Sequence, residues 1–213
     1  MYQSLANPSH PAHAAARGKD SIWRGVLRPA LTVFVVLSAI VGLLYPLAVT
    51  GVARLLFPEQ AAGSLIVRDG KVVGSRLIGQ SFTGERYFWG RPSATGPQAY
   101  NAASSGAANL GPNSPVLAEQ VATRVAALRA AHPEQRGPVP ADLATSSASG
   151  LDPHISPEAA LYQAGRIARA RQLPESEVRA LIVHATEGPQ LGLFGESRVN
   201  VLALNLALDD LKR

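Results

Sequence analysis

The pattern of apolar and polar positions divides the chain into three regions. Residues 1–26 show no apolar period and are predicted to be a disordered tail. Residues 27–56 carry one long apolar run, and residues 57–213 alternate short periodic segments with loops rich in Gly, Pro and Asn. The last region, 157 residues, is long enough to form one core. We therefore predict an α/β (α+β) domain attached to a single N-terminal transmembrane helix.

The apolar run has 25 uncharged residues between Arg28 and Arg54. As a helix it would be about 37 Å long, enough to cross a hydrocarbon core of roughly 30 Å. A cleaved signal peptide and a buried core helix are the alternatives. A signal peptide has an apolar stretch of only about 7–15 residues, so the length favours a retained membrane anchor.

The distribution of charged residues predicts the orientation of the anchor in the membrane. Four basic residues and one acidic residue precede or open the run: Arg17, Lys19, Arg24, Arg28 and Asp20, a net charge of +3. Beyond the run, only Arg54 and then Arg68 lie close. The positive-inside rule predicts a cytoplasmic N-terminus and places residues 57–213 in the periplasm of a bacterial inner membrane, where no ATP is present.

Pro46 lies inside this helix and cannot donate a hydrogen bond to the carbonyl of Gly42. Gly42 and Gly51 are small residues of the kind found where membrane helices touch. Two interpretations stay open. The segment is either a simple kinked anchor or a helix that packs, through Gly42, Pro46 and Gly51, on other membrane helices.

The outer region contains several local signals. Asp69-Gly70 in "SLIVRDGKVVGS" predicts a tight β-hairpin turn. Helices are predicted to begin near Pro115, Pro157 and Pro174, and the apolar stretch 199–211 predicts a last helix. Asn205 falls among the leucines of that helix, so we expect it to have a buried partner.

Two long loops, 92–115 and 132–156, separate these elements. Loops of this length in a compact domain are often functional. The aromatic cluster "YFWGRP" directly precedes the first loop, and its rings are expected to be either core or contact surface.

Composition and motifs exclude several functions. The net charge of +5 comes partly from the tail and does not indicate nucleic-acid binding. The chain has no cysteine, so it has neither disulfides nor a thiolate metal site. A P-loop, a GxGxxG fingerprint, a GxSxG elbow and an HExxH motif are all missing from the sequence.

Asp152 and His154 in "ASGLDPHISPEAA" are the remaining candidate chemistry. A metal site would need three or four convergent ligands, and a catalytic base would need a nucleophile within reach. Asp before Pro also favours a turn in which the carboxylate accepts backbone hydrogen bonds. A loop that holds its shape or contacts a partner is favoured over metal binding and catalysis.

An ordered set of stretches resembles one family, the C subunit of the Kdp-type potassium-transporting P-type ATPase. The set is "LRPAL" (27–31), "YP" (45–46), "LIGQSF" (77–82), "YFWGRPSAT" (87–95), "NLGPNSP" (109–115), "SASGLDPHISPEAA" (147–160) and "RVNVLALNLALD" (198–209). The resemblance covers the chain from residue 27 to its end. Members usually begin close to "LRPAL", so the tail is a departure.

The resemblance implies a non-catalytic subunit of an ATP-driven potassium uptake complex. Its partners would be a channel-like potassium-binding subunit, an ATP-hydrolysing P-type subunit, a small membrane peptide and membrane lipid, but no nucleic acid. ATP and potassium would be handled by those partner subunits, and no cofactor or metal is expected on this chain. The subunit would stabilise assembly, act as a catalytic chaperone that raises the ATP affinity of the pump subunit, and cap the extracellular potassium entrance.

The resemblance also links nucleotide to Gln80, Ser105 and Gly106, through the "LIGQ" stretch and an "SGGS"-type segment. Here that segment reads "SGAA", and a periplasmic domain cannot touch cytosolic ATP. Any effect on ATP affinity would then be a coupling across the membrane.

The residues expected to shape loops or contact partners are Tyr87, Phe88, Trp89, Arg91, Asn109, Asp152 and His154. The alternative functions are a stand-alone membrane-anchored periplasmic hydrolase and a ligand-binding module.

Overall fold

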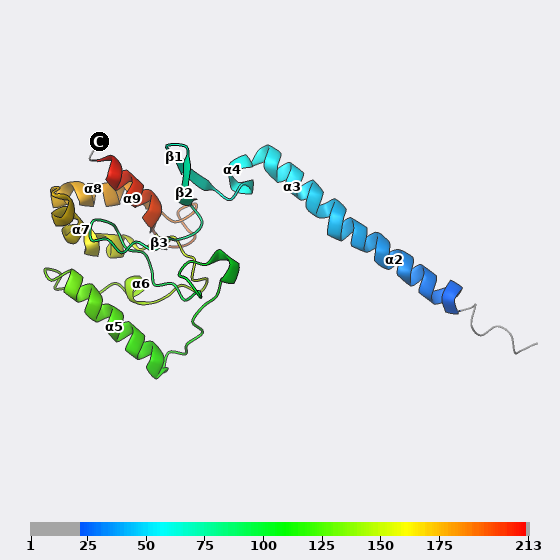
Figure 1. Cartoon of the computed structure of the whole chain (residues 1–213), viewed down its shortest axis with the longest axis horizontal. Helices are drawn as coiled ribbons and strands as arrows, with labels where there is room; N and C mark the ends of the chain where they lie inside the picture. Colours follow the sequence, from blue (N-terminus) through cyan, green and yellow to red (C-terminus); the bar gives the residue numbers. More distant parts are fainter. Residues whose placement is uncertain (1–21, 212–213) are drawn as a thin grey trace, which may run out of the picture. The chain divides into compact units, whose positions relative to one another are not determined.

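The computed structural model describes residues 22–211, which form two compact units (Figure 1). The first unit ends at Ala61 and contains the apolar run. The second begins at Ala62 and is called the outer unit below. Residues 1–21 of the predicted tail lie outside the described residues. Residues 23–26, predicted to be disordered, are helical and begin the long helix.

The first unit is one continuous helix from Trp23 to Leu56, followed by the short helix α4 (Pro58–Ala61). The long helix comprises η1 (Trp23–Leu27), α2 (Arg28–Ala39), η2 (Ile40–Leu44) and α3 (Tyr45–Leu56). It has 34 residues, a mean hydropathy of 2.3 in its most apolar stretch, and no part of that stretch is buried within the chain. Its length and apolar surface are compatible with a membrane span, as predicted.

Wide turns absorb the two prolines of this helix. Before Pro29, the N–H of Arg28 bonds to the carbonyl of Trp23, five residues earlier. Before Pro46, the N–H of Tyr45 bonds to Ile40 in the same way. These π-type turns let the helix continue where a proline ring would crowd an ordinary turn.

The outer unit is α+β, which confirms the predicted class. It has two small sheets, five α-helices and the 3₁₀ turn η3 (Ala102–Ser104) among its described residues. The helices are α5 (Pro115–Ala131), α6 (Ala141–Ala144), α7 (Pro157–Arg171), α8 (Glu175–Ala185) and α9 (Val201–Asp210). The strands are β1 (Leu65–Arg68), β2 (Lys71–Ser75), β3 (His154–Ile155), β4 (Thr186–Glu187) and β5 (Arg198–Asn200).

The predicted hairpin is confirmed: β1 and β2 pair antiparallel, with Asp69 and Gly70 both at positive φ in the turn. The second sheet, ordered β3-β5-β4 and antiparallel, was not predicted. Its strands have only two or three residues, too few for an alternating pattern. Residues 199 and 200, predicted to be helical, belong to β5, and Asn200 then caps α9 through its side chain.

The helix starts follow local signals. Ser156 accepts a hydrogen bond from the N–H of Ala159 and caps α7, whose first residue is Pro157. Pro174 stands directly before α8. Because each proline fixes φ and lacks a donor that the first turn cannot use, these positions suit it.

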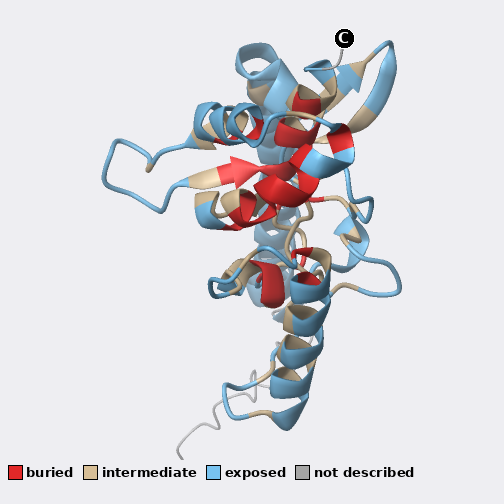
Figure 2. Cartoon of the chain, turned by 90° about the vertical axis from the view of Figure 1, so that its left-hand side faces the viewer, coloured by how far each residue is buried: buried red, intermediate tan, exposed pale blue. Residues whose placement is uncertain are grey.

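The core lies between α7, α8, α9 and the second sheet (Figure 2). Helix α7 is buried along most of its length, and α5 only at Leu128. Val178 and Ile182 of α8 are buried in this core. This packing leaves most of α5 exposed, on a separate side of the outer unit.

An irregular segment, residues 85–89, packs against this core through the buried Phe88 and belongs to no sheet. Asn205 on α9 donates to the carbonyl of Phe88 (3.0 Å) and accepts from its N–H (2.8 Å). Gln163 on α7 does the same for Trp89, at 3.1 and 2.8 Å. Two side-chain amides thus take the place of a neighbouring strand, which confirms the expected buried partner of Asn205.

Two buried arginines of α7 bind the remaining carbonyls of this segment. Arg166 donates to Glu85 and Tyr87, and Arg171 to Arg86. Burial lowers the pKa of Arg166 to about 10, so it stays charged at neutral pH. Its guanidinium also lies 4.0 Å from the centre of the Trp89 ring.

Asn205→Ala tests the amide pairing. The substitution leaves two backbone groups of Phe88 buried without partners, and we expect a loss of about 2–4 kcal/mol in the free energy of unfolding. Chemical unfolding of the full chain in mild detergent, followed by near-UV circular dichroism, measures the change. Asn113→Ala, at an exposed position, is the matched control and should change stability by less than about 0.5 kcal/mol. Equal stability of the two variants would contradict this account.

Candidate functional site

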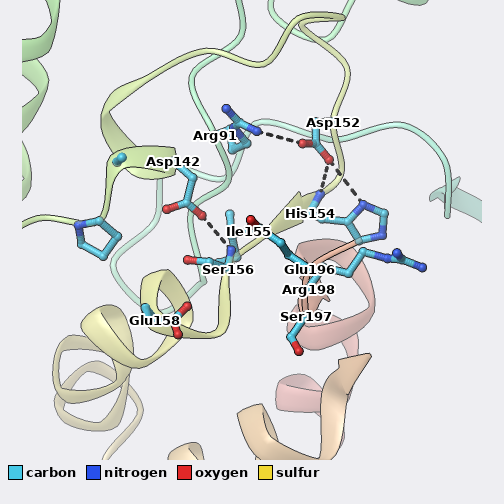
Figure 3. A pocket seen from close by; sticks show the side chains of 12 residues that line it. Arg91, Asp142, Asp152, His154, Ile155, Ser156, Glu158, Glu196, Ser197 and Arg198 are labelled. Carbon is cyan, nitrogen blue, oxygen red and sulfur yellow. Dashed lines mark hydrogen bonds and ion pairs between the residues drawn. The ribbon is translucent and has the colours of Figure 1, made fainter. Parts of the chain in front are cut away.

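An open hollow of about 570 Å³ lies in the outer unit (Figure 3). Strand β3, the start of α7 and the approach to β5 surround it. Its charged lining residues are Arg91, Asp142, Asp152, His154, Glu158, Glu196 and Arg198. The Asp152–His154 pair singled out from the sequence therefore lies in the wall of a real hollow.

Asp152 is the electrostatic centre of this wall. Its Oδ2 lies 3.2 Å from Nη1 of Arg91, and its Oδ1 lies 3.3 Å from Nδ1 of His154. The same Oδ1 accepts the backbone N–H of His154 at 3.0 Å. The structure thus brings together three of the predicted residues, Arg91, Asp152 and His154.

These contacts set the charge of the carboxylate. Burial by itself raises the pKa of Asp152, but hydrogen bonds from His154 and the charge of Arg91 outweigh it and hold the pKa below 3.8. Asp152 is therefore ionised at neutral pH and pairs with Arg91. Arg91 also donates to the carbonyl of Ser146, and its Nε is buried without a partner.

The loop 147–154 is packed tightly against two other loops. The N–H of Gly79 bonds to the carbonyl of Leu151, and the Tyr100 ring closes over Gly79. A Cβ at Gly79 would lie 2.4 Å from that ring and 2.7 Å from the backbone oxygen of Asp152. Because only glycine fits there, the "LIGQ" stretch positions Asp152 through its backbone.

The contacts of Asp152 join it to its own loop and to Arg91. Within residues 22–211, no group of three or more His, Cys, Asp or Glu could hold a metal ion. In the same part of the chain, no serine hydroxyl hydrogen-bonds to the His154 ring. The carboxylate orients the His154 ring, and Ser156 and Ser197 line the same hollow.

The aromatic residues of the predicted set lie elsewhere. Phe88 is fully buried, whereas Tyr87 and Trp89 are half-buried along the irregular segment. Asn109 is exposed, and its backbone has a left-handed conformation with φ at 51°. Phe88 is thus part of the core, and the half-buried Tyr87 and Trp89 keep some surface for contact.

The nucleotide-linked residues are engaged within the fold. Gln80 donates to the carbonyl of Val73 in β2. Ser105 and Gly106 both donate to the carbonyl of Ser149, so they support the same loop that carries Asp152. In the first unit, a Cβ at Gly42 or Gly51 would meet nothing within 4 Å among the residues that the structure describes, the helix's own backbone apart.

Sequence analysis missed His132. Its ring is buried, donates from Nδ1 to the carbonyl of Leu128, and accepts at Nε2 from Arg166. Burial and the neighbouring arginine lower its pKa, so it is neutral. A lone histidine before a proline carries no local signal for this role, because its partner is 34 residues away.

Asp152→Asn tests the electrostatic role. The change leaves Arg91 without its counter-charge, and we expect a loss of about 1–2 kcal/mol in unfolding free energy at pH 7. Glu158→Gln, which removes an exposed charge from the same hollow, is the control and should have little effect.

The difference in unfolding free energy between the original chain and Asp152→Asn should depend on pH. The folded-state pKa of Asp152 is lowered, so its contribution is complete above pH 4 and is lost as pH falls through the folded value. The stability difference between the original chain and Asp152→Asn should therefore shrink in acid, measured by chemical unfolding at pH 7 and pH 3. A difference that does not shrink contradicts the assignment.

Comparison with known proteins agrees with the pattern of stretches. The family model described as "KdpC: K+-transporting ATPase, c chain" matches residues 27–210. The "Potassium-transporting ATPase KdpC subunit" of Polaromonas naphthalenivorans is 64% identical, over 89% of this chain and 96% of that protein. The protein of the same name from Dechloromonas aromatica is 58% identical, over 88% and 98% of the two chains.

A third relative bears on the N-terminal tail. The KdpC subunit of Ralstonia nicotianae is 54% identical over 98% of this chain and all of its own length. The match therefore extends into the segment before residue 27, so the extra tail is not peculiar to this chain. Taken together, these matches mean that the chain belongs to the KdpC family, the c chain of potassium-transporting ATPases.

Proposed function

We propose that this chain is a non-catalytic accessory subunit of an ATP-driven potassium uptake pump. The observation that carries the proposal is the family match over residues 27–210. Relatives with 54–64% identity are named as potassium-transporting ATPase subunits.

In this proposal the chain crosses the bacterial inner membrane once. The helix Trp23–Leu56 has the length and apolar surface, and the basic residues before and at its start favour a cytoplasmic N-terminus. Residues 57–213 then form the periplasmic domain. Gly42, Pro46 and Gly51 offer a surface for packing on the membrane helices of partner subunits, since no atom of residues 22–211 outside the helix backbone would lie within 4 Å of a Cβ at either glycine.

The outer unit acts as a cap over the potassium entrance of the channel-like subunit. Its long loops are well suited to contact, because side chains lock them in one shape: Asp152 holds Arg91 and His154, and Ser149 holds the loop at Ser105. Such preorganised loops lose little freedom on binding. All residues of the predicted contact set except Phe88 keep some exposed surface, and Asn109 is the most exposed of them.

The effect on ATP affinity is indirect in this proposal. Gln80, Ser105 and Gly106 already bond within the outer unit, and the outer unit lies away from cytosolic ATP. The chain acts as a catalytic chaperone by favouring the state of the pump that binds ATP well. A ligand or subunit shifts such an equilibrium only through a difference in its affinity for the two states.

Cysteine labelling tests the topology. The chain has no cysteine, so Ala148→Cys, at an exposed position of the loop, gives a unique reporter. In intact spheroplasts that express this chain alone, an impermeant maleimide should label Cys at this position before lysis. Ala16→Cys, in the basic tail, is the matched control and should react only after lysis. The reverse result for the two variants would invert the proposed orientation.

Co-purification tests the assembly. In cells that express the whole system, the tagged chain should come out of mild detergent with the other pump subunits, identified by mass. A complex prepared without this chain should bind ATP more weakly by about 5–150-fold, the range of usual coupling energies, measured as nucleotide binding at equilibrium. A tagged chain that elutes alone contradicts the proposed function. An intact complex with unchanged ATP affinity contradicts the chaperone role alone.

A further inference from the structure

The turn between β4 and β5, residues 188–195, exposes three large apolar side chains. Leu191 is 88% exposed, Leu193 80% and Phe194 64%. Leu191 and Leu193 are the two most exposed large apolar residues that the structure describes beyond Ala62. Single exposed leucines are ordinary, but three within four positions at one tip indicate a contact site. We call this feature the 188–195 tip.

The tip is shaped in advance by its own backbone. Gln190 and Phe194 exchange two backbone hydrogen bonds of 2.8 and 2.9 Å, and Leu193 donates to Gln190 at 3.1 Å. Leu191 lies at φ +54°, a left-handed conformation that leucine rarely adopts. The apolar side chains are therefore presented by an ordered turn, which reduces the entropy lost on binding.

The tip is also fixed to the core. Strand β5 carries the fully buried Val199, which pairs with Thr186 in β4. At the base of the tip, Glu187 and Arg198 form an ion pair of 3.0 Å. A force on the tip is therefore transmitted to the central strand of the outer unit.

The charges around the tip indicate whether it contacts a lipid surface or a protein surface. Loops that enter a membrane interface usually carry Lys, Arg, Trp or Tyr beside the apolar residues. No Lys, Arg, Trp or Tyr occurs between Arg179 and Arg198, while Glu187 and Glu196 flank the tip. An anionic lipid surface would repel these carboxylates, so the charge pattern favours a protein.

The size of the tip indicates whether its partner is a second copy of this chain or a subunit of a larger assembly. Three side chains cover far less than the roughly 800 Å² per partner of a stable two-protein interface. They have the size of an apolar anchor that fills a pocket inside a larger interface. This suits one contact among several between subunits of a pump.

We propose that the 188–195 tip inserts Leu191, Leu193 and Phe194 into an apolar recess on the extracytoplasmic surface of another subunit of the potassium pump. The rim of that recess carries basic groups that meet Glu196. This inference rests on the proposed function and adds a specific contact surface to it.

Labelling of Leu193→Cys in the otherwise cysteine-free chain tests the contact. The probe is an impermeant maleimide, applied to membranes that hold the complete pump and to membranes that hold this chain alone. If nine-tenths of the tips are covered in the pump, labelling should slow about tenfold there and stay fast in the chain alone. Val183→Cys, on the exposed side of α8 and 71% exposed, is the matched control and should react equally in both.

Each other result overturns the inference. Equally fast labelling of Leu193→Cys in both membranes, with the pump intact by co-purification, shows that no subunit covers the tip. Slow labelling already in the chain alone shows burial in lipid or against a second copy. A tagged chain that does not co-purify with any pump subunit overturns the proposed function instead, so the two failures are distinguishable.

Leu191→Gly gives a second, independent test. Glycine accepts the left-handed backbone at this position, so the variant should unfold at the same temperature as the original chain or above it. It lacks the apolar anchor, so less of it should stay with the pump during detergent washing. Val183→Ala is the control and should be retained like the original chain. Full retention of Leu191→Gly would contradict the docking role of the tip.

Discussion

The outer unit depends on the way its helices bind an irregular stretch of backbone. Residues 85–89 enter the core only at Phe88 and have no neighbouring strand, yet their carbonyls are satisfied by Gln163, Arg166, Arg171 and Asn205. A buried backbone group without a partner costs about 1–3 kcal/mol, so this segment would be unfavourable in the core by itself. Helices α7 and α9 are thus the frame in which the segment acquires one conformation.

The consequences of this pairing reach the hollow around Asp152. Arg91 lies two residues after Trp89. The hydrogen bonds between the Trp89 backbone and the Gln163 amide therefore fix the backbone from which the Arg91 side chain extends. From the other side, Tyr100 donates to the carbonyl of Arg91 and closes over Gly79. The ion pair between Arg91 and Asp152 therefore lies where three loops meet, and its geometry depends on the packing of all three.

Sequence reasoning succeeded where the physical cause is local. Asp69-Gly70 fixes a turn by its own φ angles, and Pro157 with Ser156 fixes a helix start. It failed for His132 and for β3, because their partners, Arg166 and β5, lie 34 and more than 40 residues away. Asp152 and His154 were recognised as a pair, but Arg91, the third member, was recognised only as one contact residue among several.

The outer unit and the long helix both contact other subunits in the proposed pump, and thermodynamics limits what these contacts can do. If the presence of this chain raises ATP affinity by some factor, bound ATP must raise the affinity of the pump for this chain by the same factor. The chain must then contact at least one element that differs between the two states of the pump. A rigid outer unit suits this role, because ordered loops such as 147–154 cannot adapt equally well to both states. Asn205 and Gln163 contribute to the rigidity of the outer unit by binding the backbone of residues 88 and 89. This rigidity would let the subunit bind one pump conformation better than another.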